Sequence, residues 1–155
     1  ELLAQQYGLT GQLVALPGER DRNFQLCLAS GEKNTFKVVS ADVPLESFKS
    51  EIQAMQHLNS ELGSLLPQPL TDQAGRFISQ GSLQNGSYSW LRLQSWQPGI
   101  PLAEFRPHTT KLFHSVGHLM GKVATLLSSG AVADPHPDLP WNTDLASQIV
   151  EEGLS

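Results

Sequence analysis

The stretch NTFKVVS, residues 34–40, places a lysine inside an otherwise apolar run. Successive side chains of a strand point to opposite faces, so Phe36 and Val38 share one face while Lys37 and Val39 share the other. The ammonium group of Lys37 therefore needs water or an anion on its own face of the sheet. Two explanations stay open at this point: Lys37 reaches from an exposed face into solvent, or it meets an acidic side chain.

The segment after this strand, residues 42–63, predicts a long amphipathic helix, because it has a proline near its start and Gly63 after its last periodic residue. The apolar side chains gather on one arc of the helix: Leu45, Phe48, Ile52, Met55, Leu58 and Leu62. Glu51 falls inside this arc, whereas Glu46 and Lys49 face solvent. A buried carboxylate needs a cation, which makes Lys37, on the strand just before the helix, the candidate partner of Glu51.

The remaining segments predict an α+β fold with about five antiparallel strands. Residues 1–8 are typical of a short helix, and residues 12–18, 23–30 and 35–40 of a three-stranded meander with a tight turn at residues 31–34. Two further strand-like runs surround an Asn-Gly turn within residues 75–96, and helical spacing returns over residues 108–130.

Composition excludes several classes of function. A chain of 155 residues is long enough for one domain with a core, or for a small lobe and part of a second. The net charge of −5 argues against binding to nucleic acid or to a membrane surface. The single cysteine, Cys27, has no partner for a disulfide or a zinc site. No segment is typical of a membrane span or a signal peptide, so we expect a cytoplasmic protein.

The order of these features resembles the small lobe of a protein-kinase-like fold, and particular segments resemble the aminoglycoside phosphotransferase and choline kinase type family. The segments are LPGERDRNFQL (residues 16–26), FKVV (36–39), SEIQAMQHL (50–58) and LQSWQPGIPL (93–102). LPGERDRNF (residues 16–24) followed by FKVV is similar to the hydroxylysine-kinase-like domain, which occurs alone or fused to class III aminotransferases, and DLPWNTDL (138–145) also resembles that branch.

The resemblance implies a nucleotide site. Lys37 would hold the α- and β-phosphates of ATP, and Glu51 would position Lys37 through an ion pair. The turn from Gly18 to Asn23 would cover the phosphates; only Gly18 is a glycine there, so charged side chains such as Arg20 would do part of this work. Backbone groups from Gln94 to Trp96 would meet the adenine edge, with Trp96 and Ile78 as apolar walls.

The resemblance also implies a second lobe. Residues 1–95 would form the N-terminal lobe, and residues 96–155 the hinge and first helices of the C-terminal lobe. The His-Gly-Asp segment and later metal-binding aspartate of the family are absent, so we expect no catalytic residue or metal ligand in this chain, Mg²⁺ ligands beyond it, and no activity of the fragment alone. The alternative is a non-catalytic binding or regulatory domain of a larger enzyme, such as a pyridoxal-phosphate-dependent aminotransferase.

Two further groups contain histidine and aspartate, which are common metal ligands, but their spacing favours other interpretations. His114 and His118 share a helix face without a third ligand, which favours a solvated polar face. Asp134, His136 and Asp138 lie among prolines that extend the backbone and separate the side chains, which favours a surface loop.

Overall fold

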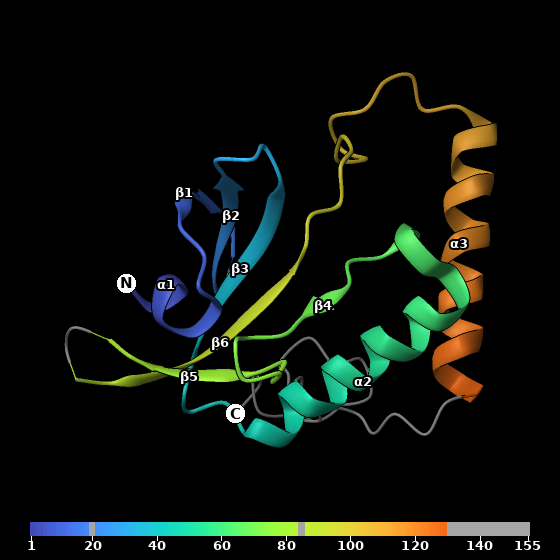
Figure 1. Cartoon of the computed structure of the whole chain (residues 1–155). Helices are drawn as coiled ribbons and strands as arrows, with labels where there is room; N and C mark the ends of the chain where they lie inside the picture. The colour runs from blue at the N-terminus through green and yellow to red at the C-terminus, as the bar shows by residue number, and fades with distance from the viewer. Residues whose placement is uncertain (19–20, 84–85, 130–155) are drawn as a thin grey trace, which may run out of the picture.

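The computed structural model of the chain describes residues 1–18, 21–83 and 86–129 (Figure 1). In chain order the elements are α1 (Leu2–Tyr7), β1 (Gly11–Leu16), β2 (Arg22–Leu28), β3 (Lys33–Ser40), α2 (Leu45–Leu62), the 3-10 helix η1 (Gly63–Leu65), β4 (Pro69–Leu70), β5 (Ser79–Ser82), β6 (Tyr88–Ser95) and α3 (Thr110–Ser129). Within this part of the chain, no helix is both long enough and apolar enough to cross a membrane.

The strands form one antiparallel sheet of six strands, in the order β1-β2-β3-β6-β4, with β5 also paired to β6. The predicted α+β architecture, the meander and the long helix are therefore confirmed. One strand of the sheet, β4, was not predicted. It has only two residues, Pro69 and Leu70, and pairs with β6. The sequence analysis missed it because a proline-containing dipeptide carries no alternation.

One face of the sheet holds the apolar core. The buried members of this cluster come from α1 and from the central strands: Leu3, Tyr7, Leu26, Phe36, Val38, Leu91 and Leu93. Tyr7 fixes α1 against this face, because its ring meets that of Phe36 edge-on at 6.0 Å and its hydroxyl donates to the carbonyl oxygen of Leu91 at 3.1 Å. We refer to this side as the α1 face.

The opposite face carries α2, and Figure 1 shows α2 and α3 next to each other on that side of the molecule. Phe48 of α2 is buried and lies 6.4 Å from the ring of Trp90 on β6. The indole N–H of Trp90 donates to the carbonyl oxygen of Val43 at 3.1 Å, just before the helix begins. The ring Nε2 of His57 lies 3.1 Å from the carbonyl oxygen of Leu126, which joins α3 to α2. We refer to this side as the α2 face.

A buried aspartate closes the loop between β4 and β5. The carboxylate of Asp72 accepts hydrogen bonds from the backbone N–H groups of Ala74 and Arg76, from Nε of Arg76 and from the hydroxyl of Ser79, all at 2.7–2.9 Å. Burial by itself raises the pKa of Asp72, but these hydrogen bonds outweigh burial and lower the pKa to about 2. The loop is also tied to α1, since the N–H of Gln73 donates to the carbonyl oxygen of Gln6 at 3.0 Å.

Candidate functional site

Polar side chains form two cross-strand rows on the α2 face of the sheet. The register pairs Asn23 with Lys37 and Lys37 with Arg92, so these residues of β2, β3 and β6 lie side by side. The neighbouring row pairs Gln25 with Thr35, and Thr35 with Gln94. Residues directly opposite each other in an antiparallel ladder share a face, so both rows lie opposite the apolar core. The three strands bring together residues that lie up to 71 positions apart.

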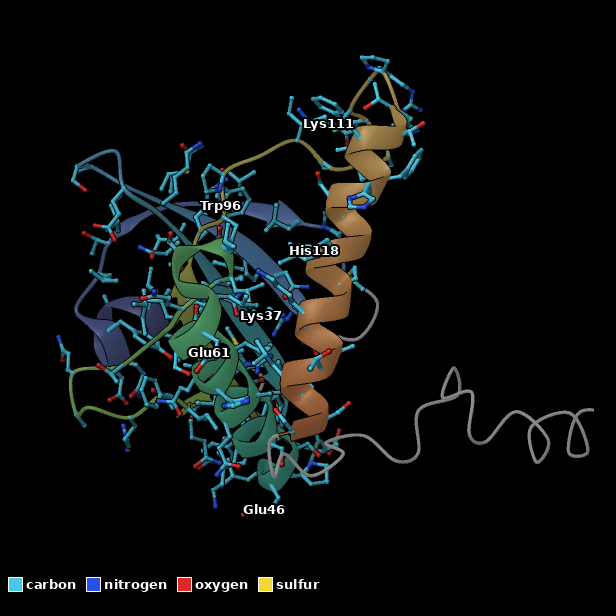
Figure 2. The ribbon with its side chains drawn as sticks, turned by 90° about the vertical axis from the view of Figure 1, so that its right-hand side faces the viewer. Lys37, Glu46, Glu61, Trp96, Lys111 and His118 are labelled. Atoms are coloured by element: carbon cyan, nitrogen blue, oxygen red, sulfur yellow. The ribbon has the colours of Figure 1, made fainter. Side chains whose placement is uncertain are left out.

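Lys37 lies in the middle of the first row, between two strands and behind the helices of this side (Figure 2). Burial lowers its pKa below the usual value, and the neighbouring guanidinium of Arg92 lowers it further. The carboxylates of Asp21 and Glu51 raise this pKa but do not restore it, and Glu51 has the smaller influence of the two. An anion placed beside the ammonium group would therefore be bound favourably.

The cation that the structure pairs with Glu51 is an arginine of the sheet. Its carboxylate forms an ion pair with a guanidinium N–H of Arg92, and only 5% of the Arg92 side chain is exposed, against 29% of that of Glu51. The guanidinium carbon of Arg92 also lies 5.2 Å from the centre of the Phe48 ring. Glu51 turns towards the sheet, as its place in the apolar arc of the helix predicts, and its carboxylate pairs there with Arg92 of β6.

The partner was missed because the sequence analysis considered only the lysine nearest to the helix in the chain. The signal that could have found it is the alternation in SWLRLQS, residues 89–95, which places Arg92 on one face of a strand with Trp90 and Gln94. A charged residue in the middle of a predicted buried strand needs a partner as much as Lys37 does.

The turn between β1 and β2 lies at one end of the polar row. Leu16 pairs with Asn23 across the base of the turn, and the side-chain amide of Asn23 makes long hydrogen bonds to the carbonyl oxygens of Pro17 and Asp21, at 3.4 and 3.5 Å. Gly18 is needed for close approach, because a Cβ there would lie 2.4 Å from the carbonyl oxygen of Asp21. The structure thus brings Asn23 and Asp21 close to Lys37, whereas Arg20 lies outside the described residues.

The predicted hinge begins at the other end of the second row. Gln94 pairs with Thr35 of β3 and with Pro69 of β4, so it belongs to the sheet. The N–H of Ser95 donates to the carbonyl oxygen of Gln68 at 2.9 Å. Trp96 follows the last residue of β6, and its side chain is half-buried (Figure 2). Of the three hinge residues, Trp96 is therefore the one whose backbone lies beyond the ladder.

The described residues contain no group of three or more histidine, cysteine or acidic side chains that could hold a metal ion. His114 and His118 are both exposed on α3, as the interpretation of a polar helix face predicts. The cluster Asp134, His136 and Asp138 lies outside the described residues.

Comparison with known proteins gives matches among solved structures. No family model matches the chain, and no curated protein matches it in sequence. An amicoumacin kinase in complex with AMP-PNP and Ca²⁺ has a TM-score of 0.69 and 19% identity over 85% of this chain and 40% of that one. A microcompartment-associated aminopropanol kinase has a TM-score of 0.69 and 12% identity over 92% of this chain and 44% of that one.

The fold is that of a kinase-like N-terminal lobe. The expected kinase-like small lobe is confirmed at the level of fold, since both similar structures are named as kinases. The chain spans less than half of the length of either neighbour. The comparisons give no support to the hydroxylysine-kinase branch or to a fused aminotransferase.

Proposed function

We propose that this chain is the ATP-binding part of a small-molecule phosphotransferase. The observation that carries the proposal is the position of Lys37: a half-buried ammonium group on the α2 face, between Asn23 and Arg92, beside a turn that a glycine keeps tight. The fold supports it, because both neighbours are named as kinases and one was solved with the ATP analogue AMP-PNP.

In this proposal the chain's own residues bind and orient the nucleotide. Lys37 contacts the α- and β-phosphates, since its ammonium group is incompletely compensated by the acidic groups around it. The turn from Gly18 to Asn23, including Arg20, covers the phosphates from the end of β1. The base lies towards Trp96, and the backbone of Trp96 meets its edge because the N–H of Ser95 is already donated to Gln68. Gln94 lies beneath the base as part of the sheet.

The described residues fit the nucleotide better than they fit a divalent metal. Asp21 and Glu51 are the carboxylates that act on Lys37, and no metal-holding cluster occurs among the described residues. We therefore place the Mg²⁺ ligands, and the group that orients the acceptor hydroxyl, in a second lobe. In this proposal residues 1–95 form the N-terminal lobe, and residues 96–155 form the hinge and the beginning of the second lobe. Bound Mg²⁺ would neutralise charge on the phosphates. By itself the fragment would bind nucleotide without transferring phosphate.

We further propose that the acceptor is the hydroxyl group of an amine or amino-acid-like compound. The support is the name of one structural neighbour, an aminopropanol kinase, together with the resemblance of residues 16–24 and 36–39 to hydroxylysine-kinase-like sequences. A fold by itself does not select a substrate, so the acceptor has to be tested on a protein that contains both lobes.

The test is the affinity of the chain for AMP-PNP, measured by calorimetry with and without Mg²⁺. Replacing Lys37 by methionine keeps most of the length of the side chain and removes its charge, and we expect the affinity to fall by about 10- to 100-fold. The matched control is Lys33→Met, because Lys33 lies on the same strand and face but is exposed at the strand end. The affinity of this variant for AMP-PNP should equal that of wild type. Absence of binding, or equal binding by wild type and Lys37→Met, would contradict the proposal.

A further inference from the structure

The α1 face of the sheet is wider than the helix that covers it. With six residues, α1 is about 9 Å long, whereas the axes of β1, β2, β3 and β6 together span about 14 Å. The helix packs towards β5 and β6: the Tyr7 hydroxyl donates to the carbonyl oxygen of Leu91, and a Cβ at Gly81 would touch the side chain of Leu2. The part of this face formed by β1 and β2 is therefore left without a helix over it.

A hollow of about 830 Å³ lies between α1 and these two strands. Its walls are apolar on both sides, with Leu2 and Leu3 from α1, Leu13 from β1 and Phe24 from β2. Leu13 is 43% exposed and Phe24 is partly exposed, although the register places both on the face that carries the core. Pockets that hold small molecules have volumes of about 300–1,000 Å³ and mostly apolar walls, so the hollow has the size and lining of a ligand site.

Arg22 adds a single positive charge to the described residues that line this hollow. The register pairs it with Val38, so its side chain lies on the α1 face. Its guanidinium forms no ion pair within the described part of the chain, and the carboxylate that also lines the hollow, that of Glu1, is exposed at the start of α1. A second hollow of about 490 Å³ shares Arg22, Val38 and Leu83 with the first. The guanidinium is therefore available to an anion where the two hollows meet.

We propose that this hollow is a second ligand site, which binds a small apolar carboxylic acid such as a medium-chain fatty acid. The apolar chain lies between α1 and the side chains of Leu13 and Phe24, and the carboxylate pairs with Arg22. The planar guanidinium suits a carboxylate, because it can donate two parallel hydrogen bonds to the two oxygens. The site lies on the face of the sheet opposite Lys37, and it does not rest on the proposed function.

The experiment is an NMR titration of the whole chain with decanoate, kept below the concentration at which decanoate forms micelles. The backbone amide signals of the residues that line the hollow should move on one saturable binding curve, and those of Lys37 should stay in place. Decan-1-ol has the same chain length without the charge, so it should bind at the same signals about tenfold more weakly. This pair of ligands separates the contribution of the carboxylate from that of the apolar chain.

Two variants test the two halves of the site. Arg22→Gln should weaken decanoate binding about tenfold and leave decan-1-ol binding unchanged, because only the carboxylate uses the guanidinium. Lys33→Gln is the matched control: it changes the net charge by the same amount, but Lys33 is exposed and lies on the α2 face, so its affinity for decanoate should equal that of wild type. Leu13→Ser should weaken binding of both ligands about fivefold, because it removes part of the apolar wall.

The inference would be overturned if decanoate caused no saturable shift, or if wild type and Arg22→Gln bound it equally well. It would also be overturned if the signals of the hollow moved with protein concentration alone and decanoate had no effect, because a second copy of the chain would then cover this face. Arg22 and Leu13 are both exposed, so we expect their variants to fold. The comparison of decanoate with decan-1-ol on wild type tests the same claim without any variant.

Discussion

Two ion pairs on opposite sides of the sheet show contrasting patterns of burial. In the pair of Asp72 with Arg76, the carboxylate is 1% exposed and the arginine 59% exposed. In the pair of Glu51 with Arg92, the arginine is 5% exposed and the carboxylate 29%. The buried Asp72 has hydrogen bonds from two backbone N–H groups, a hydroxyl and a guanidinium, whereas the buried Arg92 has an Nε without a partner among the described residues.

This difference separates a structural site from a candidate functional one. The Asp72 pair is fully hydrogen-bonded, joins its loop to α1 and borders the apolar core, so its contribution is to stability. The Arg92 pair is incompletely satisfied and lies beside a second cation, Lys37, on the polar rows of the α2 face. A buried cation with an unsatisfied donor beside a second cation is more typical of binding sites than of cores.

The largest effect should come from the core of the α1 face. Leu26 is fully buried there, and Leu26→Ala should lower the free energy of unfolding by about 2–4 kcal/mol, since it removes apolar contacts and leaves a cavity. Val14→Ala is the control on the other face, because Val14 is 42% exposed and should cost less than about 1 kcal/mol. Denaturant unfolding measures both. Equal losses would show that burial in the core of the α1 face does not determine the cost.

A smaller effect on stability is expected at Asp72. Asp72→Asn keeps the shape of the side chain but loses the charge, and the unfolding free energy at neutral pH should fall by about 1–2 kcal/mol, allowing for the exposure of Arg76. The folded pKa of about 2 lies below the unfolded value of 3.8. The stabilisation is therefore complete above the unfolded pKa and is lost as the pH falls towards 2.

The measurement is the difference in unfolding free energy between wild type and Asp72→Asn from neutral pH down to about pH 2. The difference should shrink through the acid range as the wild-type carboxyl becomes protonated. A difference that does not change with pH would show that the ionised form of Asp72 has no special stability.

The smallest effect on folding, with a selective effect on binding, is expected at Gly18. A methyl group there would meet the carbonyl oxygen of Asp21, so Gly18→Ala should displace the turn and weaken AMP-PNP binding by about fivefold. The control is Gly117→Ala on α3, where a Cβ meets nothing within 4 Å and alanine should stabilise the helix by about 0.5–1 kcal/mol. Calorimetry should find the affinity of this control unchanged. If Gly18→Ala and Gly117→Ala bound AMP-PNP with the same affinity, the turn would have no part in the nucleotide site.

The sequence was sufficient for the elements that repeat a local pattern. Alternation predicted the meander and the two faces of β3, and the apolar arc of residues 45–62 predicted both the helix and the side on which Glu51 lies. The partner of Glu51 depends on the register between β3 and β6, which are far apart in the sequence, and a local pattern does not contain that information. Periodicity places Lys37 and Arg92 on their strands equally well, and only the pairing of β3 with β6 shows that they lie opposite each other.

The central claim is that a nucleotide binds on the α2 face at Lys37. The most direct test is to follow the backbone amide signals of the chain by NMR while AMP-PNP is added. We predict that the signals of Gly18, Asn23, Lys37 and Trp96 move together with one binding curve, while those of α1 and of Asp72 stay in place. Movement centred on α1, or no movement at all, would contradict the account.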